Sequence, residues 1–165
     1  MKKRALILSF LLLTIFQVSF SQTDKRESFQ FPDQIGSIND YEKLFSDTEI
    51  KELIDIISKH EKETSNQIVI VSVNTFEPFE TLFQYSLELG DYWGVGQIGK
   101  SNGLMIVFGK KMRQIRIQVG YGLEDKLKDE EAKLIIDKVI IPEFKNGNYF
   151  NGIKNGLLVI IEEIN

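Results

Sequence analysis

The spacing of hydrophobic residues along the chain predicts four helices and three strands. Apolar side chains recur every three or four positions, as on one face of a helix, in residues 46–63, 78–93, 129–141 and 150–164. Residues 68–73 and 104–108 are continuous apolar runs, which are typical of strands buried on both faces. Residues 115–119 alternate between apolar and polar, as a half-buried edge strand does.

Turn and cap residues mark several ends of these elements. Residues 46–49 read Ser-Asp-Thr-Glu, the pattern of a capping box that starts the first helix. Pro78 is expected in the first turn of the second helix, and the third helix is expected to stop at Pro142. The tight turn at residues 109–112 predicts a hairpin between the second and third strands.

This order of elements predicts an α/β fold, a three-layer α/β/α sandwich with a small mixed sheet. Two parallel strands are joined by a right-handed crossover, the third strand pairs back antiparallel, and helices cover both faces. Because the third strand returns beside the second, the loop that begins at Gly120 should lie next to the loop that enters the second strand at Asn102. Two distant stretches of chain therefore meet at one end of the sheet.

The first 21 residues have the pattern of a signal peptide. Three basic residues precede an apolar run to Val18, and the small residues Ser19 and Ser21 fit a cleavage site after Ser21. A membrane anchor is the alternative, but a spanning helix needs about 20 predominantly apolar residues and this run is shorter. We therefore expect a signal peptide at 1–21, a flexible tail at 22–34 and one domain at 35–165, periplasmic or secreted, with no membrane span after cleavage.

Charge and cysteine content narrow the possible partners. The chain has 24 acidic and 20 basic residues, and loss of the three basic residues in 1–21 leaves 17, a net charge of −7. Such a surface repels nucleic acids and anionic lipids, so no nucleic-acid partner is expected, whereas metal ions are better candidates. With no cysteine, the core alone must hold the fold.

Acidic residues gather at the end of the sheet where the two loops meet. Four carboxylates are expected there, from Asp91, Glu124, Asp125 and Asp129. Oxygen ligands suit Ca²⁺ or Mg²⁺, and they suit zinc poorly in a chain with one histidine and no cysteine. The same acids are equally consistent with solvated loop residues that bind nothing. Asp129 is also consistent with a helix cap. Three neighbours would wall or support such a site: Trp93, Asn102 and Tyr121.

The same segments carry a family resemblance. The sequence Asp-Tyr-Trp-Gly-Val-Gly at 91–96, Asn-Gly-Leu at 102–104, and Arg-Ile-Gln-Val-Gly-Tyr-Gly-Leu-Glu at 116–124 resembles the TPM domain family. Further matches are Ile-Asn-Asp at 38–40 and Ile-Pro-Glu-Phe at 141–144. The resemblance implies an exported α/β/α domain whose acidic loop residues bind divalent metal. It also implies kinship with plant proteins of the thylakoid lumen described as acid phosphatases tied to photosystem II repair.

Residue by residue, the family pattern extends to four acids. Asp40, Asp91, Glu124 and Asp129 match it, with Asn102 beside them, whereas Asp125 is a local addition. Asp40 precedes a helix that should begin at the opposite end of the sheet, so only a segment folding back along the sheet would bring it to the others.

Three functions remain open from the sequence. The first is an exported metal-binding module that assists an envelope or secreted protein partner. The second is a metal-dependent acid phosphatase, although the sequence has no Walker loop, cysteine nucleophile or histidine cluster and no catalytic residue is assigned. The third is a purely structural interaction domain.

Overall fold

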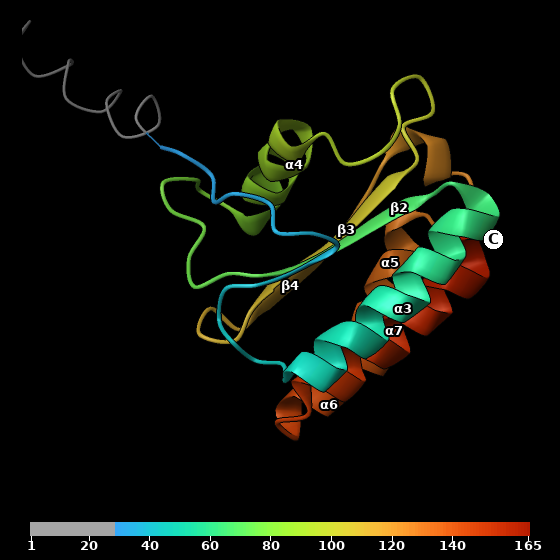
Figure 1. Ribbon diagram of the computed structural model, residues 1–165. Coiled ribbons are helices and arrows are strands. Elements are labelled where there is room, and N and C mark those ends of the chain that lie inside the picture. The colour runs from blue at the N-terminus through green and yellow to red at the C-terminus, as the bar shows by residue number, and fades with distance from the viewer. Residues whose placement is uncertain (1–28) are drawn as a thin grey trace, which may run out of the picture. The chain divides into compact units, whose positions relative to one another are not determined.

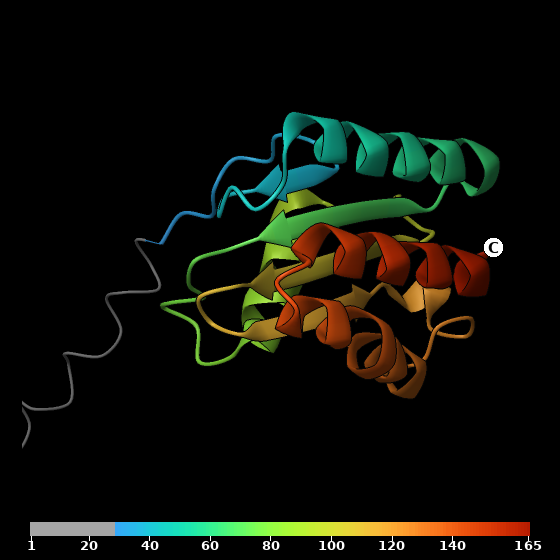
Figure 2. The ribbon, with the colours of Figure 1, turned by 90° about the horizontal axis from the view of Figure 1, so that it is seen from below.

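A mixed sheet of four strands lies at the centre of the computed structural model, which describes residues 29–165. The strands lie side by side in chain order, as Figures 1 and 2 together show: β1 (Ile38–Asp40), β2 (Gln67–Ser72), β3 (Gly103–Gly109) and β4 (Gln114–Val119). The first three strands are parallel and β4 is antiparallel to β3. The predicted mixed sheet and its hairpin are thereby confirmed.

Strand β1 was not predicted. It has only three residues, two of them polar, and such a segment is too short to show alternation. Its parallel register places Ile38 opposite Ile70 and Asp40 opposite Ser72. The sheet therefore has one strand more than expected, at the margin beside β2.

Helices cover both faces of the sheet, which confirms the three-layer α/β/α architecture (Figures 1 and 2). One face is covered by α3 (Asp47–Thr64), α7 (Tyr149–Ile164) and the run of α5 (Asp129–Ile135), the π-helical turn η2 (Ile136–Ile140) and α6 (Ile141–Lys145). Helix α4 (Leu82–Trp93) covers the other face. Successive side chains of the fully buried β3 therefore point to opposite faces of the sheet and pack into two separate apolar layers.

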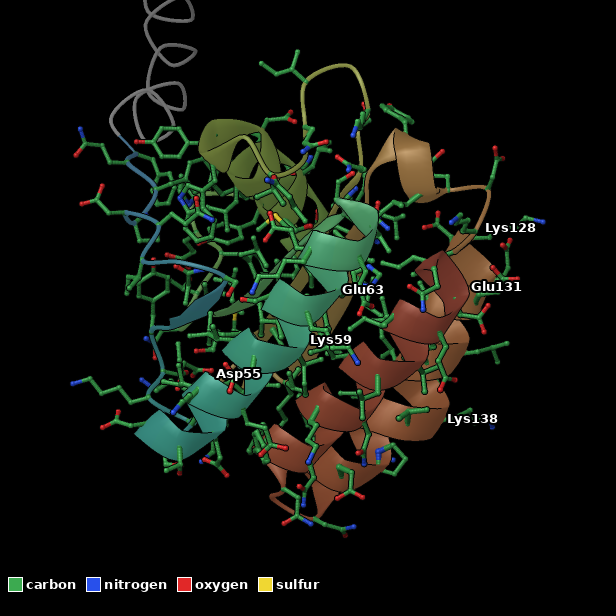
Figure 3. All side chains as sticks on the ribbon, turned by 45° about the vertical axis from the view of Figure 1, so that its right-hand side comes forward. Asp55, Lys59, Glu63, Lys128, Glu131 and Lys138 are labelled. Carbon is green, nitrogen blue, oxygen red and sulfur yellow. The ribbon has the colours of Figure 1, made fainter. Side chains whose placement is uncertain are left out.

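Helix α3 begins as its sequence predicts. Ser46 is the N-cap: its Oγ accepts a hydrogen bond from the Glu49 amide, and the Ser46 amide donates to Glu49 Oε2 at 2.7 Å. The capping box is therefore confirmed. The outer face of this helix carries charges of both signs at four-residue intervals, Asp55, Lys59 and Glu63 (Figure 3).

Two proline-based predictions were wrong. Helix α4 begins at Leu82 rather than at Pro78, because Thr81 is its N-cap and accepts a hydrogen bond from the Gln84 amide. The third helix does not stop at Pro142 but continues through the π-helical turn into α6. Pro142 lies in the first turn of α6, where the absence of its N–H is tolerated.

The chain packs against α4 before β1 begins. The Phe31 ring lies 5.4 Å from that of Phe79 and 5.3 Å from that of Tyr92, measured between centroids. The Trp93 indole N–H donates to the carbonyl of Pro32 at 3.0 Å. Phe31 and Pro32, which belong to the expected tail at 22–34, therefore contact the domain. The predicted signal peptide lies outside the described residues.

No helix within residues 29–165 is long and apolar enough to cross a membrane.

Candidate functional site

The loops before β3 and after β4 meet at one end of the sheet, as the topology predicted. The Gly120 amide donates to the carbonyl of Gly103 at 2.8 Å, and the Gly122 amide donates to the carbonyl of Ser101 at 3.0 Å. The C-terminal end of α4 leads into the same region. Three segments that are distant in sequence therefore share one end of the fold.

Glycines allow these backbones to approach one another. A Cβ atom on Gly103 would lie 2.3 Å from the carbonyl oxygen of Val95, and one on Gly122 would lie 2.0 Å from that of Lys100. Both distances are far below van der Waals contact, so only glycine fits. The space that the missing side chains leave is filled by neighbouring backbone.

A cleft of about 830 Å³ opens between these loops, α4 and the start of α5. Asp91 enters it from the last turn of α4, and Asp129 enters it as the first residue of α5. Glu124 and Asp125 enter it from the segment after the short 3-10 helix η1 (Tyr121–Leu123). All four predicted loop acids therefore line one cleft, here called the acidic cleft.

The four carboxylates of the acidic cleft are exposed. Among the described residues none of them forms an ion pair. No three Asp, Glu or His side chains within residues 29–165 come close enough to hold an ion between them. The cleft therefore concentrates negative charge without presenting a closed coordination shell.

Arg116 brings positive charge to the opposite wall of the cleft. It projects from β4, and its guanidinium lies 4.3 Å from the centre of the Phe83 ring. Burial lowers the pKa of Arg116, and the negative charge of Asp129 opposes that lowering. The side chain nevertheless stays charged, as arginines in proteins do. Arg116 and Asp129 thus interact electrostatically across the cleft.

Three predicted site residues have different surroundings from one another. Tyr121 lines the acidic cleft and is 84% exposed. Asn102 is buried and lies outside the cleft lining, where its side chain accepts a hydrogen bond from the Gln97 amide and donates one to the carbonyl of Ser65, both at 2.8 Å. Trp93 faces the N-terminal segment through its bond to Pro32. Asn102 and Trp93 therefore hold the surrounding chain in place.

Asp40 lies at the opposite end of the sheet from the acidic cleft. It ends β1, and β1 is parallel to β2 and β3. Its carboxylate accepts a hydrogen bond from Ser72 Oγ at 2.5 Å and another from the Phe45 amide at 2.8 Å. The structure therefore separates Asp40 from the other four predicted ligands and gives it partners that fix the turn into α3.

Sequence reasoning missed the apolar part of the cleft. Phe83, Leu87 and Ile98 line it and are 46%, 41% and 105% exposed. Phe83 and Leu87 are four residues apart on α4 and so lie on one helix face. That spacing was a usable signal, but helix periodicity alone does not say whether such a face is covered by other parts of the protein.

The chain is similar to solved domains from several bacteria. The N-terminal domain of a protein from P. gingivalis is 28% identical with a TM-score of 0.70, and the match covers 76% of this chain and 80% of that one. BA42 from the psychrophilic bacterium Bizionia argentinensis is 21% identical with a TM-score of 0.65, over 75% of this chain and 83% of that one. The N-terminal domain of cg2496 from Corynebacterium glutamicum is 14% identical with a TM-score of 0.60, and the match covers 83% of this chain and 86% of that one. The last two likenesses concern the fold alone.

A family model matches most of the chain. No curated protein matches this chain. The model of the TPM domain, however, matches residues 38–163, a span that includes the whole sheet and every residue of the acidic cleft named above. This chain belongs to the TPM domain family.

Proposed function

We propose that the acidic cleft binds a divalent cation, Ca²⁺ or Mg²⁺, and that the domain acts as a binding module for an envelope or secreted partner. One observation carries the proposal. Four carboxylates, from the end of α4, the segment after η1 and the start of α5, line a single cleft, and none of them forms an ion pair among the described residues. Their mutual repulsion is a cost that a bound cation relieves.

The carboxylate donors suit a hard cation by their chemistry, although they do not converge closely enough to enclose one. Carboxylate oxygens are the ligands that Ca²⁺ and Mg²⁺ prefer. Because no three acidic side chains converge within residues 29–165, an ion in the cleft would keep part of its water shell. We therefore propose weak binding, with a dissociation constant of about 10⁻⁴ to 10⁻³ M, the range of extracellular calcium modules. Asp91, Glu124, Asp125 and Asp129 would hold the ion, with Tyr121 beside them.

Calorimetric and thermal titration with Ca²⁺ and with Mg²⁺ tests this proposal. A ligand that binds only the folded state stabilises it, by about 1.4 kcal/mol at ten times the dissociation constant. The protein should release or absorb heat and melt at a higher temperature as the ion is added. The double variant Asp91→Asn plus Glu124→Gln should lose both responses.

A matched control removes the same charge elsewhere. The double variant Asp55→Asn plus Glu163→Gln changes two exposed carboxylates on α3 and α7, and Figure 3 shows Asp55 on the outer face of α3. It should bind cations as the unmodified protein does. Equal loss of binding in both double variants would mean that net charge, rather than the cleft, attracts the ions, and the proposal would fail.

Phosphatase activity is the alternative that the same variants address. No cysteine or histidine is among the residues that line the acidic cleft. A binding module predicts that the purified protein does not hydrolyse phosphomonoesters in Ca²⁺ or Mg²⁺. Hydrolysis that the Asp91→Asn plus Glu124→Gln change abolishes would replace the binding proposal with a metal-dependent phosphatase.

A further inference from the structure

Exposed hydrophobic side chains gather around the acidic cleft. Nine large hydrophobic residues are exposed within residues 29–165, and four of these nine line the cleft. The four are here called the apolar rim: Phe83, Leu87, Ile98 and Tyr121. A single exposed hydrophobic side chain needs no explanation, but several around one hollow are typical of a surface that another molecule covers. The clustering therefore indicates an interaction surface.

Ile98 is the most exposed member of the apolar rim, and it lies on a loop that hydrogen bonds hold in place. This loop, between α4 and β3, projects from the end of the sheet (Figure 1). The Gln97 amide donates to Asn102 Oδ1 at 2.8 Å, and the Lys100 amide donates to the carbonyl of Gln97 at 3.0 Å. Because the loop is already ordered, a partner that covers Ile98 loses little affinity to the entropy of fixing it.

The floor of the cleft is apolar, although exposed carboxylates surround it. Met105, Val119 and Leu127 line the cleft, and all three are buried. Lysine and arginine side chains have an aliphatic stem and a charged end, and they commonly lay the stem along apolar surface while the charge stays near water. A hollow with an apolar floor and acidic surroundings therefore matches a lysine or arginine side chain.

Acidic side chains outnumber basic ones around the cleft. The basic residues that line it are Arg116 and Lys128. Five acidic residues line it, and none of the five forms an ion pair within the described part of the chain: Asp91, Glu124, Asp125, Asp129 and Glu130. This imbalance favours an occupant with positive charge. A second copy of the chain, which is itself acidic, would bring like charge to the cleft and is disfavoured.

Arg116 shows how the cleft accommodates a basic side chain. Its guanidinium lies 4.3 Å from the centre of the Phe83 ring, and it interacts electrostatically with Asp129. An aromatic face beside a carboxylate is a favourable environment for a guanidinium. Phe83 is still 46% exposed, so Arg116 covers only part of the ring. A basic side chain from another molecule would find the same kinds of groups beside this pair.

We propose that the acidic cleft and its apolar rim bind a segment of a partner protein that carries both basic and hydrophobic side chains. A lysine or arginine of the segment would enter the cleft, and neighbouring hydrophobic side chains would cover Ile98 and Tyr121. Burial of apolar surface would supply most of the affinity, because exposed ion pairs contribute little. The carboxylates would supply the choice of partner.

This inference rests on the binding-module part of the proposed function and names the chemistry of the partner. It does not require a bound ion. An ion and the segment would use the same carboxylates, so the experiment is carried out without divalent cations.

The probe is the peptide acetyl-Ser-Leu-Lys-Phe-Lys-Leu-Ser-amide, added to the isotope-labelled protein in a buffer with EDTA. Backbone amide resonances around Ile98 and through residues 120–130 should shift and saturate, whereas those around Asp55 on α3 should change little. The same peptide with glutamate in place of lysine should bind about tenfold more weakly, because it brings like charge to the cleft.

Two matched variants test the apolar rim. Ile98→Ser and Leu134→Ser each remove one exposed hydrophobic side chain, the first from the apolar rim and the second from a part of α5 that does not line the cleft. Ile98→Ser should weaken peptide binding about fivefold, because the peptide no longer buries that side chain. Leu134→Ser should bind the peptide as the unmodified protein does. Both side chains lie outside the core, so both variants should fold.

Three results would overturn the proposal: no saturable binding of the lysine peptide, equal binding of the glutamate peptide, or equal weakening by Ile98→Ser and Leu134→Ser. Shifts at the apolar rim when the protein alone is concentrated would assign the surface to a second copy and would also overturn it. Peptide binding in EDTA by a protein that gives no response to Ca²⁺ or Mg²⁺ would refute the ion proposal alone. The two proposals can therefore fail separately.

Discussion

Gly122 packs directly against the loop at residues 100–101, and there is no room for a side chain between them. A methyl group there would meet the Lys100 carbonyl oxygen at 2.0 Å, and that oxygen belongs to backbone that cannot rotate away. Gly36 offers a contrast, because a Cβ atom there would meet nothing within 4 Å. The two glycines are thus a matched pair for testing how tightly the cleft loops are packed.

The variant Gly122→Ala should lower the free energy of unfolding by about 1 to 3 kcal/mol, the usual effect of forcing extra volume into a packed site. Gly36→Ala should change it by less than about 0.5 kcal/mol, as surface substitutions do. Urea denaturation of both variants measures the difference. Equal stability of the two variants would mean that the cleft loops are not packed as described.

His60 is the only histidine in the chain, and it is buried near the end of α3. Its Nε2 atom lies 3.3 Å from Thr64 Oγ1 and 3.5 Å from Asn66 Nδ2. Burial lowers the pKa of His60, and the nearby Glu63 carboxylate opposes that lowering. The folded protein therefore favours the neutral imidazole.

This lowered pKa predicts a loss of stability in acid. In the unfolded chain His60 titrates near its ordinary pKa of about 6.5, so below that pH the unfolded state binds more protons than the folded state. The free energy of unfolding should therefore fall as the pH decreases from about 7.5 to 5. The variant His60→Gln should show a weaker fall over the same range, measured by urea denaturation at each pH. Parallel curves for the two proteins would contradict the assignment.

At the scale of the elements, local sequence signals predicted most helices and strands. The capping box at Ser46 and the apolar runs of β2 and β3 are local patterns, and they appear where expected. The predictions failed where contacts with other parts of the fold, rather than the local sequence, determine the secondary structure. Strand β1 exists because β2 offers it a parallel edge, and the continuation through Pro142 depends on a π-helical turn that no residue pattern indicates.

The start of α3 gives the most local of the stability predictions. The variant Ser46→Ala removes the side-chain acceptor for the Glu49 amide and should lower the free energy of unfolding by about 1 kcal/mol. Lys51→Ala, on the exposed side of the same helix, should have a much smaller effect. Chemical denaturation compares them, and an undiminished stability of Ser46→Ala would show that the cap contributes little.

At the scale of the whole molecule, strand direction predicted where the candidate site lies. The antiparallel return of β4 brings the acids at 124, 125 and 129 to the same end of the sheet as Asp91 and leaves Asp40 at the other end. The surroundings of Asn102 and Trp93 were beyond prediction, because their partners at Ser65 and Pro32 come from segments whose packing no periodicity specifies.

Cation binding in the acidic cleft is tested most directly by a nuclear magnetic resonance titration of the isotope-labelled protein with Ca²⁺ up to about 10 mM, a concentration above that needed for weak extracellular sites. We expect saturable shifts of backbone amides around Asp91 and through residues 120–130, the segments that line the acidic cleft, with little change around Asp55 and Glu63 on α3. An absence of shifts, or shifts spread evenly over all acidic surfaces without saturation, would contradict the claim that the cleft is a cation-binding site.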